Sequence, residues 1–160
     1  GGKAAERSID IYLAKFDGTW LITGISLGDY FIVYTNDEYG FSFSLPRSWE
    51  GYSIINSTWE GFVVDSHEEM TEEGPMLSIR HPDWTIEEER QDIPIMIFTI
   101  NQWNDMQEGY FHIGAAPTNP RELGRNDNYV FALPARYNYA FPEGFEEVDD
   151  IIENNPLEAF

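Results

Sequence analysis

The sequence predicts an α+β fold in which short helices accompany an antiparallel sheet, with a β-hairpin extension at the N-terminus. Residues 41–45 alternate large apolar with small polar side chains, and a period of two is typical of a strand with one buried face. Residues 93–100 are almost continuously apolar, as in a strand covered on both faces. Residues 145–152 carry apolar side chains at helical spacing behind N-terminal carboxylates, which indicates an amphipathic helix.

The first 28 residues are expected to form the hairpin extension, and residues 29–160 the main domain. Apolar and polar residues alternate over residues 9–14, and Asp17-Gly18 is a strong signal for a two-residue turn before a returning strand. An isolated hairpin is only marginally stable in water. We therefore expect it to pack on the main sheet or to pair with a second copy of the chain as a homodimer.

The main domain reads as a series of short strands separated by turns. Pro46 ends the strand at 41–45 because proline lacks an amide donor, and Trp49 then lies close enough to cover the apolar face of that strand. Glu60-Gly61 reads as a break between two strands. In chain order the expected strands cover residues 31–34, 41–45, 51–59, 62–64, 76–81, 93–100, 122–125 and 128–133.

Capping residues and charge predict the remaining helix and the loops. Asn101 can cap a helix over 102–108, and Gly109 ends it because glycine readily adopts a left-handed conformation. Residues 67–75 are acidic and without periodicity, which predicts an exposed loop. The charged connection at 83–92 is expected to contain a short helical turn.

The composition describes an acidic protein with enough apolar residues for a packed core. Of its 160 residues 42% are hydrophobic, and 29 acidic against 9 basic side chains give a net charge of −20. Nucleic acids and anionic membranes are poor partners for such a surface, because they are bound through Lys and Arg. Cationic peptides, basic proteins and divalent cations suit it better.

Two further features of the composition limit the chemistry and the location of the chain. No cysteine is present, which excludes disulfides, thiolate metal sites and thiol nucleophiles. No run approaches the ~18 apolar residues of a membrane span, so we expect membrane association only through a lipid anchor outside this chain.

Residues 39–49 read Tyr-Gly-Phe-Ser-Phe-Ser-Leu-Pro-Arg-Ser-Trp, an aromatic-Gly-Phe strand that runs into Pro-x-x-Trp. This motif resembles the opening element of the PsbP-like superfamily, which includes an oxygen-evolving photosystem subunit, a Ran-binding import factor and many bacterial lipoproteins. Five later segments resemble an uncharacterised group of Firmicutes lipoproteins: residues 80–82, 91–96, 111–117, 122–126 and 129–137. The resemblance covers about residues 31–160.

The resemblance implies an α/β/α sandwich with a central antiparallel sheet for the main domain. It also implies a non-catalytic binding or scaffold module, extracytoplasmic and tethered to a Gram-positive cell envelope as a lipoprotein, with a protein or peptide partner and no cofactor. Residues 15–25 instead resemble the closing strands of a SnoaL-like cone domain, where an Asp-Gly-x-Trp-x-Ile turn is common. The hairpin would then be the remnant of an upstream domain.

Catalysis would need a base, and the natural candidates are His67, His81 and His112. A Ser-His-Asp arrangement can be drawn from Ser78, His81 and Asp83, although no Gly-x-Ser-x-Gly elbow is present. A small hydrolase that uses a histidine and carboxylates in a cleft is therefore the alternative function.

An acidic group near His67 is the candidate for metal binding. Neither EF-hand nor His-Glu-x-x-His spacing occurs, so no specific metal site is expected. The carboxylates of this group are Glu68, Glu69, Glu72 and Glu73.

A set of basic, histidine and aromatic residues in the second half of the chain is the candidate ligand or partner surface. Arginine favours bidentate contacts to carboxylates. Two interpretations stay open: the arginines pair internally with the abundant acidic residues, or they line a pocket for an anionic or polar group together with Trp84 and Tyr137. The candidate residues are Arg80, His81, Trp84, His112, Arg125, Arg136 and Tyr137.

Overall fold

The computed structural model of the chain describes residues 9–27, 31–63, 70–114 and 118–160. The chain is 16% helical and 50% strand, and the pairs between its named strands are antiparallel. The α+β class predicted from the sequence is therefore confirmed.

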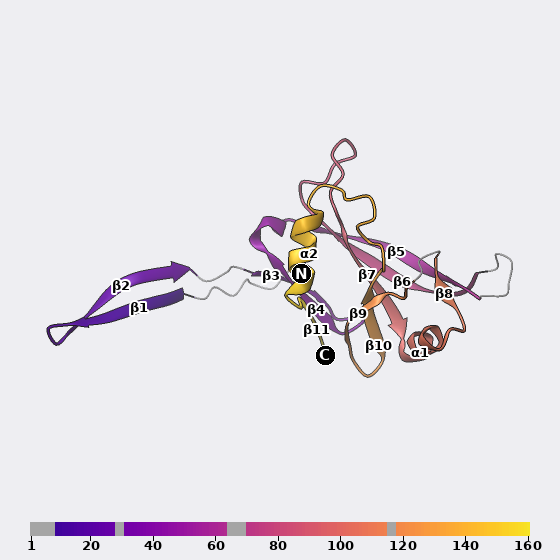
Figure 1. Ribbon diagram of the computed structural model, residues 1–160, viewed down its shortest axis with the longest axis horizontal. Helices are drawn as coiled ribbons and strands as arrows, with labels where there is room; N and C mark the ends of the chain where they lie inside the picture. Colours follow the sequence, from indigo (N-terminus) through magenta and orange to yellow (C-terminus); the bar gives the residue numbers. More distant parts are fainter. Residues whose placement is uncertain (1–8, 28–30, 64–69, 115–117) are drawn as a thin grey trace.

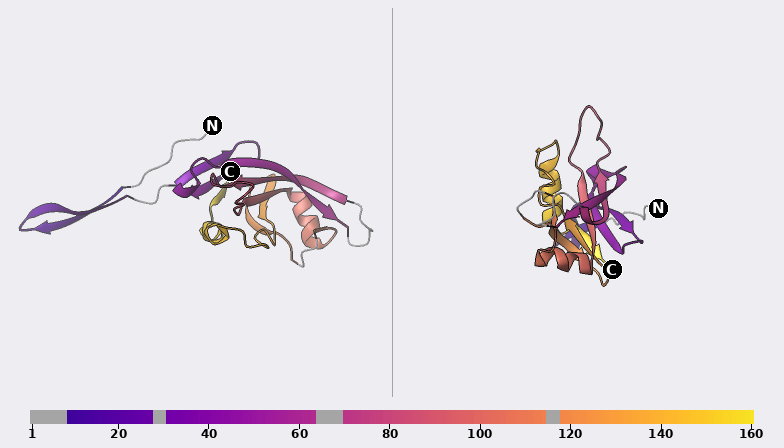
Figure 2. Two further views of the ribbon diagram at one scale, coloured as in Figure 1. Left: turned by 90° about the horizontal axis from the view of Figure 1, so that it is seen from above. Right: turned by 90° about the vertical axis from the view of Figure 1, so that its right-hand side faces the viewer.

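The N-terminal hairpin forms a two-stranded sheet of its own from β1 (Ile9–Phe16) and β2 (Thr19–Leu27). Asp17 and Gly18 connect the strands with φ angles of 46° and 78°, the left-handed conformation that a two-residue hairpin turn requires. The predicted hairpin is confirmed. Figures 1 and 2 show it projecting away from the other sheets, so the expectation that it packs on the main sheet is wrong.

The largest sheet contains six strands: β5 (Ser53–Phe62), β6 (Met70–Arg80), β7 (Ile93–Thr99), β8 (His112–Ile113), β9 (Arg121–Arg125) and β10 (Tyr129–Leu133). Their order across the sheet is β8-β5-β6-β7-β10-β9, so β8 and β9 form its two edges. β7 is the predicted apolar run, and its residues 95–98 are buried on both faces as expected.

A smaller sheet contains β3 (Phe31–Asn36), β4 (Phe41–Pro46) and β11 (Leu157–Ala159) in the order β11-β4-β3. Phe41, Phe43 and Leu45 are fully buried along β4, which confirms the alternation read from the sequence. A short 3-10 helix, Arg47–Trp49, follows β4, and the Trp49 ring is buried in the same cluster. The sequence did not predict β11.

The helix α1 (Ile100–Glu108) begins two residues earlier than the sequence predicts. Its cap is Thr99 and not Asn101: the Thr99 hydroxyl accepts a hydrogen bond from the amide of Gln102, whose side chain accepts one from the amide of Thr99. This reciprocal capping box satisfies two amides that a helix start would otherwise leave unpaired. Gly109 ends the helix with a φ of 83°, as predicted.

Different elements cover the two faces of the six-stranded sheet. Side chains alternate along β10, which places Phe131 and Leu133 in one buried cluster and Val130 and Ala132 in the other. The first cluster also includes side chains of β4 and of α2 (Phe145–Glu153), the predicted amphipathic helix, and the second includes α1. Within the described residues, neither helix is long and apolar enough to cross a membrane.

The long β5–β6 pair departs from the sequence prediction at Gly61. β5 continues through the expected break at Glu60-Gly61, and the pairing register shifts between Gly61 and Phe62 instead. A Cβ atom at Gly61 would lie 2.5 Å from the ring of Phe111. Glycine at this position therefore marks a close ring contact and not a break.

The acidic stretch that predicts a loop is partly a strand, because β6 begins at Met70. β6 pairs with β7 only from Met76 onward, so residues 70–75 pair on one side alone, with β5. Carboxylates and a proline are tolerated along such an open edge. The helical turn expected within 83–92 is also wrong, since these residues form turns and bends.

Candidate functional site

Two hollows flank the turn that follows β10, residues 134–139. Pro134 follows the strand directly, and the turn is closed by hydrogen bonds from the Tyr137 amide to the Pro134 carbonyl (3.3 Å) and from the Tyr139 amide to the Arg136 carbonyl (3.2 Å). Arg136 and Tyr139 line both hollows. The turn therefore places one arginine and one tyrosine between two surface cavities.

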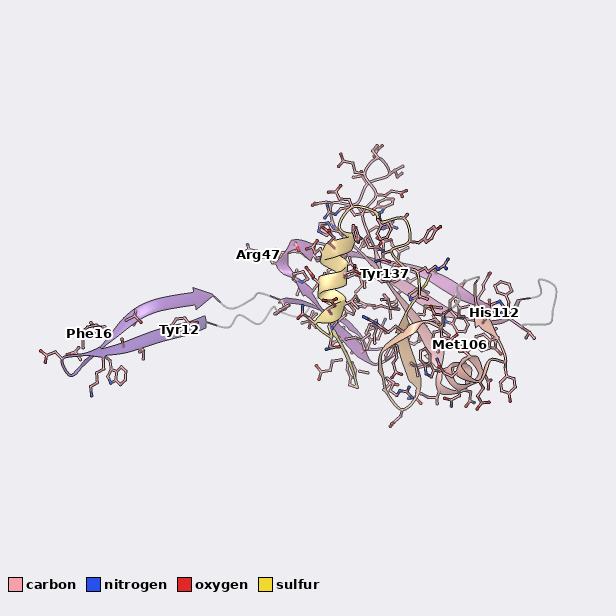
Figure 3. All side chains as sticks on the ribbon, viewed as in Figure 1. Tyr12, Phe16, Arg47, Met106, His112 and Tyr137 are labelled. Carbon is pink, nitrogen blue, oxygen red and sulfur yellow. The ribbon has the colours of Figure 1, made fainter. Side chains whose placement is uncertain are left out.

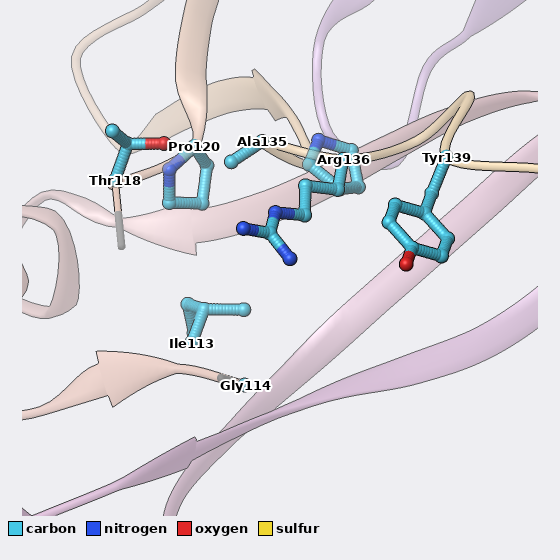
Figure 4. A pocket seen from close by; sticks show the side chains of 8 residues that line it. Ile113, Gly114, Thr118, Pro120, Ala135, Arg136 and Tyr139 are labelled. Atoms are coloured by element: carbon cyan, nitrogen blue, oxygen red, sulfur yellow. The ribbon is translucent and has the colours of Figure 1, made fainter. Parts of the chain in front are cut away.

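The apolar hollow has a volume of about 330 Å³. Its walls include Ile113 at the end of β8 and Pro120 before β9, and Figure 4 shows the guanidinium of Arg136 extending toward the space between them. Arg136 is exposed, and its Cζ lies 5.8 Å from the ring centroid of Tyr139. The other lining residues are Gly114, Thr118, Pro134 and Ala135.

Arg136 forms no ion pair with any residue that the structure describes. Three other arginines between residues 80 and 136 are paired. Arg80 is held by Asp92, Arg90 by Glu143, and Arg125 by Glu122, at closest distances of 2.7, 2.9 and 2.5 Å. Internal pairing thus describes three of the five arginines between residues 80 and 136, whereas Arg121 and Arg136 form no ion pair with a described residue.

The polar hollow, on the other side of the turn, has a volume of about 480 Å³. In its wall Arg80 donates to both carboxylate oxygens of Asp92, and the Arg80 guanidinium stacks 3.9 Å from the ring centroid of Trp84. Trp84 therefore holds a paired arginine, and its ring face toward Arg80 is occupied.

Two buried polar atoms belong to residues that line the polar hollow. Gln91 donates from Nε2 to the carbonyls of Asp92 (2.8 Å) and Tyr137 (3.1 Å), which fixes the amide orientation and leaves Oε1 without a partner among the described residues. The Nε of Arg90 is likewise buried and has no hydrogen-bond partner among the described residues.

Tyr137 anchors the turn to α2 and does not offer its hydroxyl to a ligand. Its hydroxyl donates to a carboxylate oxygen of Asp149, and Asn138 donates to the same oxygen at 3.3 Å. Burial, together with the hydrogen bond to Asp149, raises the pKa of Tyr137 well above its usual value. The phenol therefore stays neutral and acts as a structural donor.

His81 is a buried core residue, only 5% exposed. Its Nδ1 accepts a hydrogen bond from the Asp83 amide at 3.1 Å and lies 3.8 Å from the Asp83 carboxylate, and its ring packs edge-on against Trp49 with the ring centroids 5.0 Å apart. Burial and the nearby charge of Arg90 lower the pKa of His81 below the usual 6.5. The lowered pKa favours a neutral imidazole at pH 7, and its Nδ1 accepts a hydrogen bond from the backbone.

The residues proposed for catalysis and metal binding do not converge among the described residues. His81 Nδ1 accepts a hydrogen bond from the Asp83 amide and lies 3.8 Å from the Asp83 carboxylate, but no hydrogen bond joins His81 to Ser78 within the described chain. No group of three metal-ligating side chains occurs in the part of the chain that the structure describes. His67, Glu68 and Glu69 lie outside the described residues, and Glu72 and Glu73 belong to β6.

The seven candidate residues divide into three sets, and one of them is His81 alone, which is buried against Trp49. Arg80, Trp84, Arg136 and Tyr137 line the polar hollow together. His112 and Arg125 belong to β8 and β9, the opposite edges of the sheet, and Figure 3 places His112 well apart from Tyr137. Tyr139 was missed, because a tyrosine three residues after an arginine carries no signal in the sequence.

No family model, curated protein or solved structure matches this chain.

Proposed function

We propose that the chain is a non-catalytic binding module for a protein or peptide partner. In this proposal Arg136 binds a carboxylate of the partner, and the apolar hollow holds an apolar group next to that carboxylate. The observation that carries the proposal is the Arg136 guanidinium, which stands at an apolar cavity and has no ion pair with any described residue. A guanidinium presents a fixed fork of donors that matches a carboxylate. His81 is buried and its Nδ1 accepts a hydrogen bond from the Asp83 amide, which supports a role of the chain in binding over one in hydrolysis.

The lining of the apolar hollow indicates what stands beside the carboxylate. Ile113, Pro120, Pro134 and Ala135 offer apolar surface, and the volume of about 330 Å³ lies at the lower end of ligand pockets. Such a space suits one apolar side chain. A C-terminal residue with an apolar side chain presents both groups together.

The charge of the chain limits the kind of partner. At a net charge of −20, the protein repels a strongly acidic ligand at long range. We propose a partner that is basic overall and brings a single carboxylate to Arg136. Opposite net charges would steer the two proteins together, while the arginine contact would fix the orientation.

For the fold and location, we propose a PsbP-like sandwich in an extracytoplasmic lipoprotein of a Gram-positive envelope. The proposal rests on the resemblance of residues 39–49 and of the later segments, and it is supported by the burial of Trp49 and by α1 and α2 packing on different faces of one sheet. Metabolic labelling of the full-length gene product with a palmitate analogue tests it. Failure to label would contradict the lipoprotein assignment.

Titration with a matched pair of probes tests the binding site. N-acetylphenylalanine carries an apolar side chain beside a carboxylate, and its primary amide differs only in lacking that charge. We expect the acid to shift the backbone amide NMR signals of residues 135–139 and the amide to bind at least about fivefold more weakly, a difference of about 1 kcal/mol.

Two arginine variants complete the test. R136Q is expected to abolish the preference for the acid, whereas R125Q, which breaks only the exposed pair with Glu122, is expected to keep it. Equal binding of the acid and the amide, or an unchanged preference in R136Q, would overturn the proposal.

A further inference from the structure

The β1–β2 hairpin presents a continuous apolar face to solvent. Ile11 and Leu13 alternate along β1, Leu13 pairs with Ile22, and Trp20 lies two residues before Ile22 on β2. Lys15, which pairs with Trp20, places its Nζ 5.8 Å from the Trp20 ring centroid, so both side chains share this face. We call Ile11, Leu13, Trp20 and Ile22 the apolar hairpin face; they are 55, 55, 63 and 62% exposed.

Among the described strands, no third strand pairs with the hairpin. The hairpin forms a sheet of its own and projects away from the body of the protein (Figure 1). Two-stranded hairpins are marginally stable in water unless a further strand or an apolar surface packs on them. A cover for the apolar hairpin face would supply the missing surface.

The charge of the hairpin differs from that of the rest of the chain. Residues 9–27 contain two aspartates, Asp10 and Asp17, and one lysine, Lys15, for a net charge of −1, against −20 for the whole chain. Two copies can therefore approach through their hairpins with little of the repulsion that the acidic surface imposes elsewhere. A strongly basic partner, in contrast, would gain little electrostatic attraction there.

The area of the face is sufficient for a second copy. At the exposures above, and at about 200 Å² for each side chain of this size, the face offers roughly 500 Å² per hairpin. Two such faces bury roughly 1,000 Å², the lower limit for a specific interface. A symmetric pair brings the same apolar chemistry from both sides.

We propose that the apolar hairpin face packs against the same face of a second copy of this chain, forming a weak homodimer. This inference is independent of the proposed ligand site, because no hairpin residue lines the apolar hollow and the hairpin projects away from the sheet that contains β10 (Figure 1). The small interface predicts a dissociation constant on the order of 10–100 µM.

Sedimentation velocity over about 2–200 µM tests the proposal on the full chain. We expect the wild type to shift from monomer to dimer across this range. The variant L13T/I22T alters the apolar hairpin face and is expected to stay monomeric. Its matched control, F16T/L21T, alters two exposed residues on the opposite face and is expected to dimerise like the wild type.

Cross-linking provides a second readout, because the chain contains no cysteine. I22C treated with a short bismaleimide is expected to give a covalent dimer, whereas L21C, one residue away on the other face, is not. A monomeric wild type at all concentrations, equal weakening by both double variants, or equal cross-linking of both cysteines would overturn the proposal. Retained binding of N-acetylphenylalanine by L13T/I22T would show that the ligand site does not depend on the dimer.

Discussion

Replacing Gly74 by alanine is expected to destabilise the chain strongly, because a tryptophan ring occupies the space of the new methyl group. Gly74 pairs with Trp59 across β5 and β6, and a Cβ at position 74 would lie 2.5 Å from two ring carbons of Trp59. The ring has little room to move. Its Nε1 donates to the Ile97 carbonyl at 2.8 Å, and its face stacks on Phe98 at 4.3 Å.

The magnitude follows from the contacts that the methyl group disturbs. Forcing extra volume into a packed core costs about 1–3 kcal/mol, a lost hydrogen bond costs about 1 kcal/mol, and a disturbed aromatic pair costs about 0.5–1.5 kcal/mol. Alanine recovers about 0.5–1 kcal/mol relative to glycine in a strand, because it restricts the unfolded chain. We expect a net loss of about 2–4 kcal/mol in the free energy of unfolding.

Urea denaturation followed by circular dichroism measures this change. The midpoint is expected to fall by about 1–2 M, given an m-value of about 2 kcal/mol/M for a chain of this size. G124A is the matched control, because its Cβ would meet the flexible end of the Leu157 side chain, at 2.8 Å, and that group can move aside. A G74A variant as stable as the wild type would refute the reasoning about the Trp59 ring.

Three further predictions concern a helix cap and two titrating groups. T99A removes the capping box of α1 and is expected to cost about 1 kcal/mol in urea denaturation, whereas N101A should change little; the reverse order would contradict the cap assignment. The pKa of His81 is lower in the folded chain than the value of 6.5 in the unfolded chain, so the unfolded chain takes up the proton first as the pH falls. The contribution of His81 to stability is therefore complete above pH 6.5 and is lost as the pH falls through the folded pKa. H81Q should therefore lose less stability than the wild type between about pH 7 and 5, and parallel curves would count against burial of the neutral imidazole. Folding raises the pKa of Tyr137, so above about pH 10 the phenol ionises first in the unfolded chain and the folded chain loses stability. Y137F should lack the part of this loss that comes from Tyr137, and an unchanged pH dependence of stability would contradict the hydrogen bond to Asp149.

The sequence predicted strands well where one face is buried, and poorly at sheet edges. The alternation over 41–45 reports burial directly, and β4 has that pattern of burial. Residues 70–75 look like a loop because they carry carboxylates, a glycine and a proline, yet β5 supplies a partner on one side. Similarly, β11 exists only because β4, far away in the sequence, pairs with it.

The candidate site was predictable in composition but not in arrangement. Arg125 meets Glu122 three residues away, a pair that local spacing allows, whereas Arg80 meets Asp92 only through the fold. The sequence also contains no sign that Arg136 would form no ion pair with a described residue. Which carboxylates an arginine reaches depends on the order of the strands, and a single sequence does not contain that order.

The side-chain Nε–Hε NMR signal of Arg136 tests the central claim most directly. In the full chain, addition of N-acetylphenylalanine is expected to shift this signal, because a bound carboxylate accepts hydrogen bonds from the guanidinium. The amide derivative is expected to leave the signal in place, and the Nε–Hε signal of the paired Arg125 should not respond to either probe. An Arg136 signal that stays unchanged while the acid shifts other signals would contradict the assignment of the site.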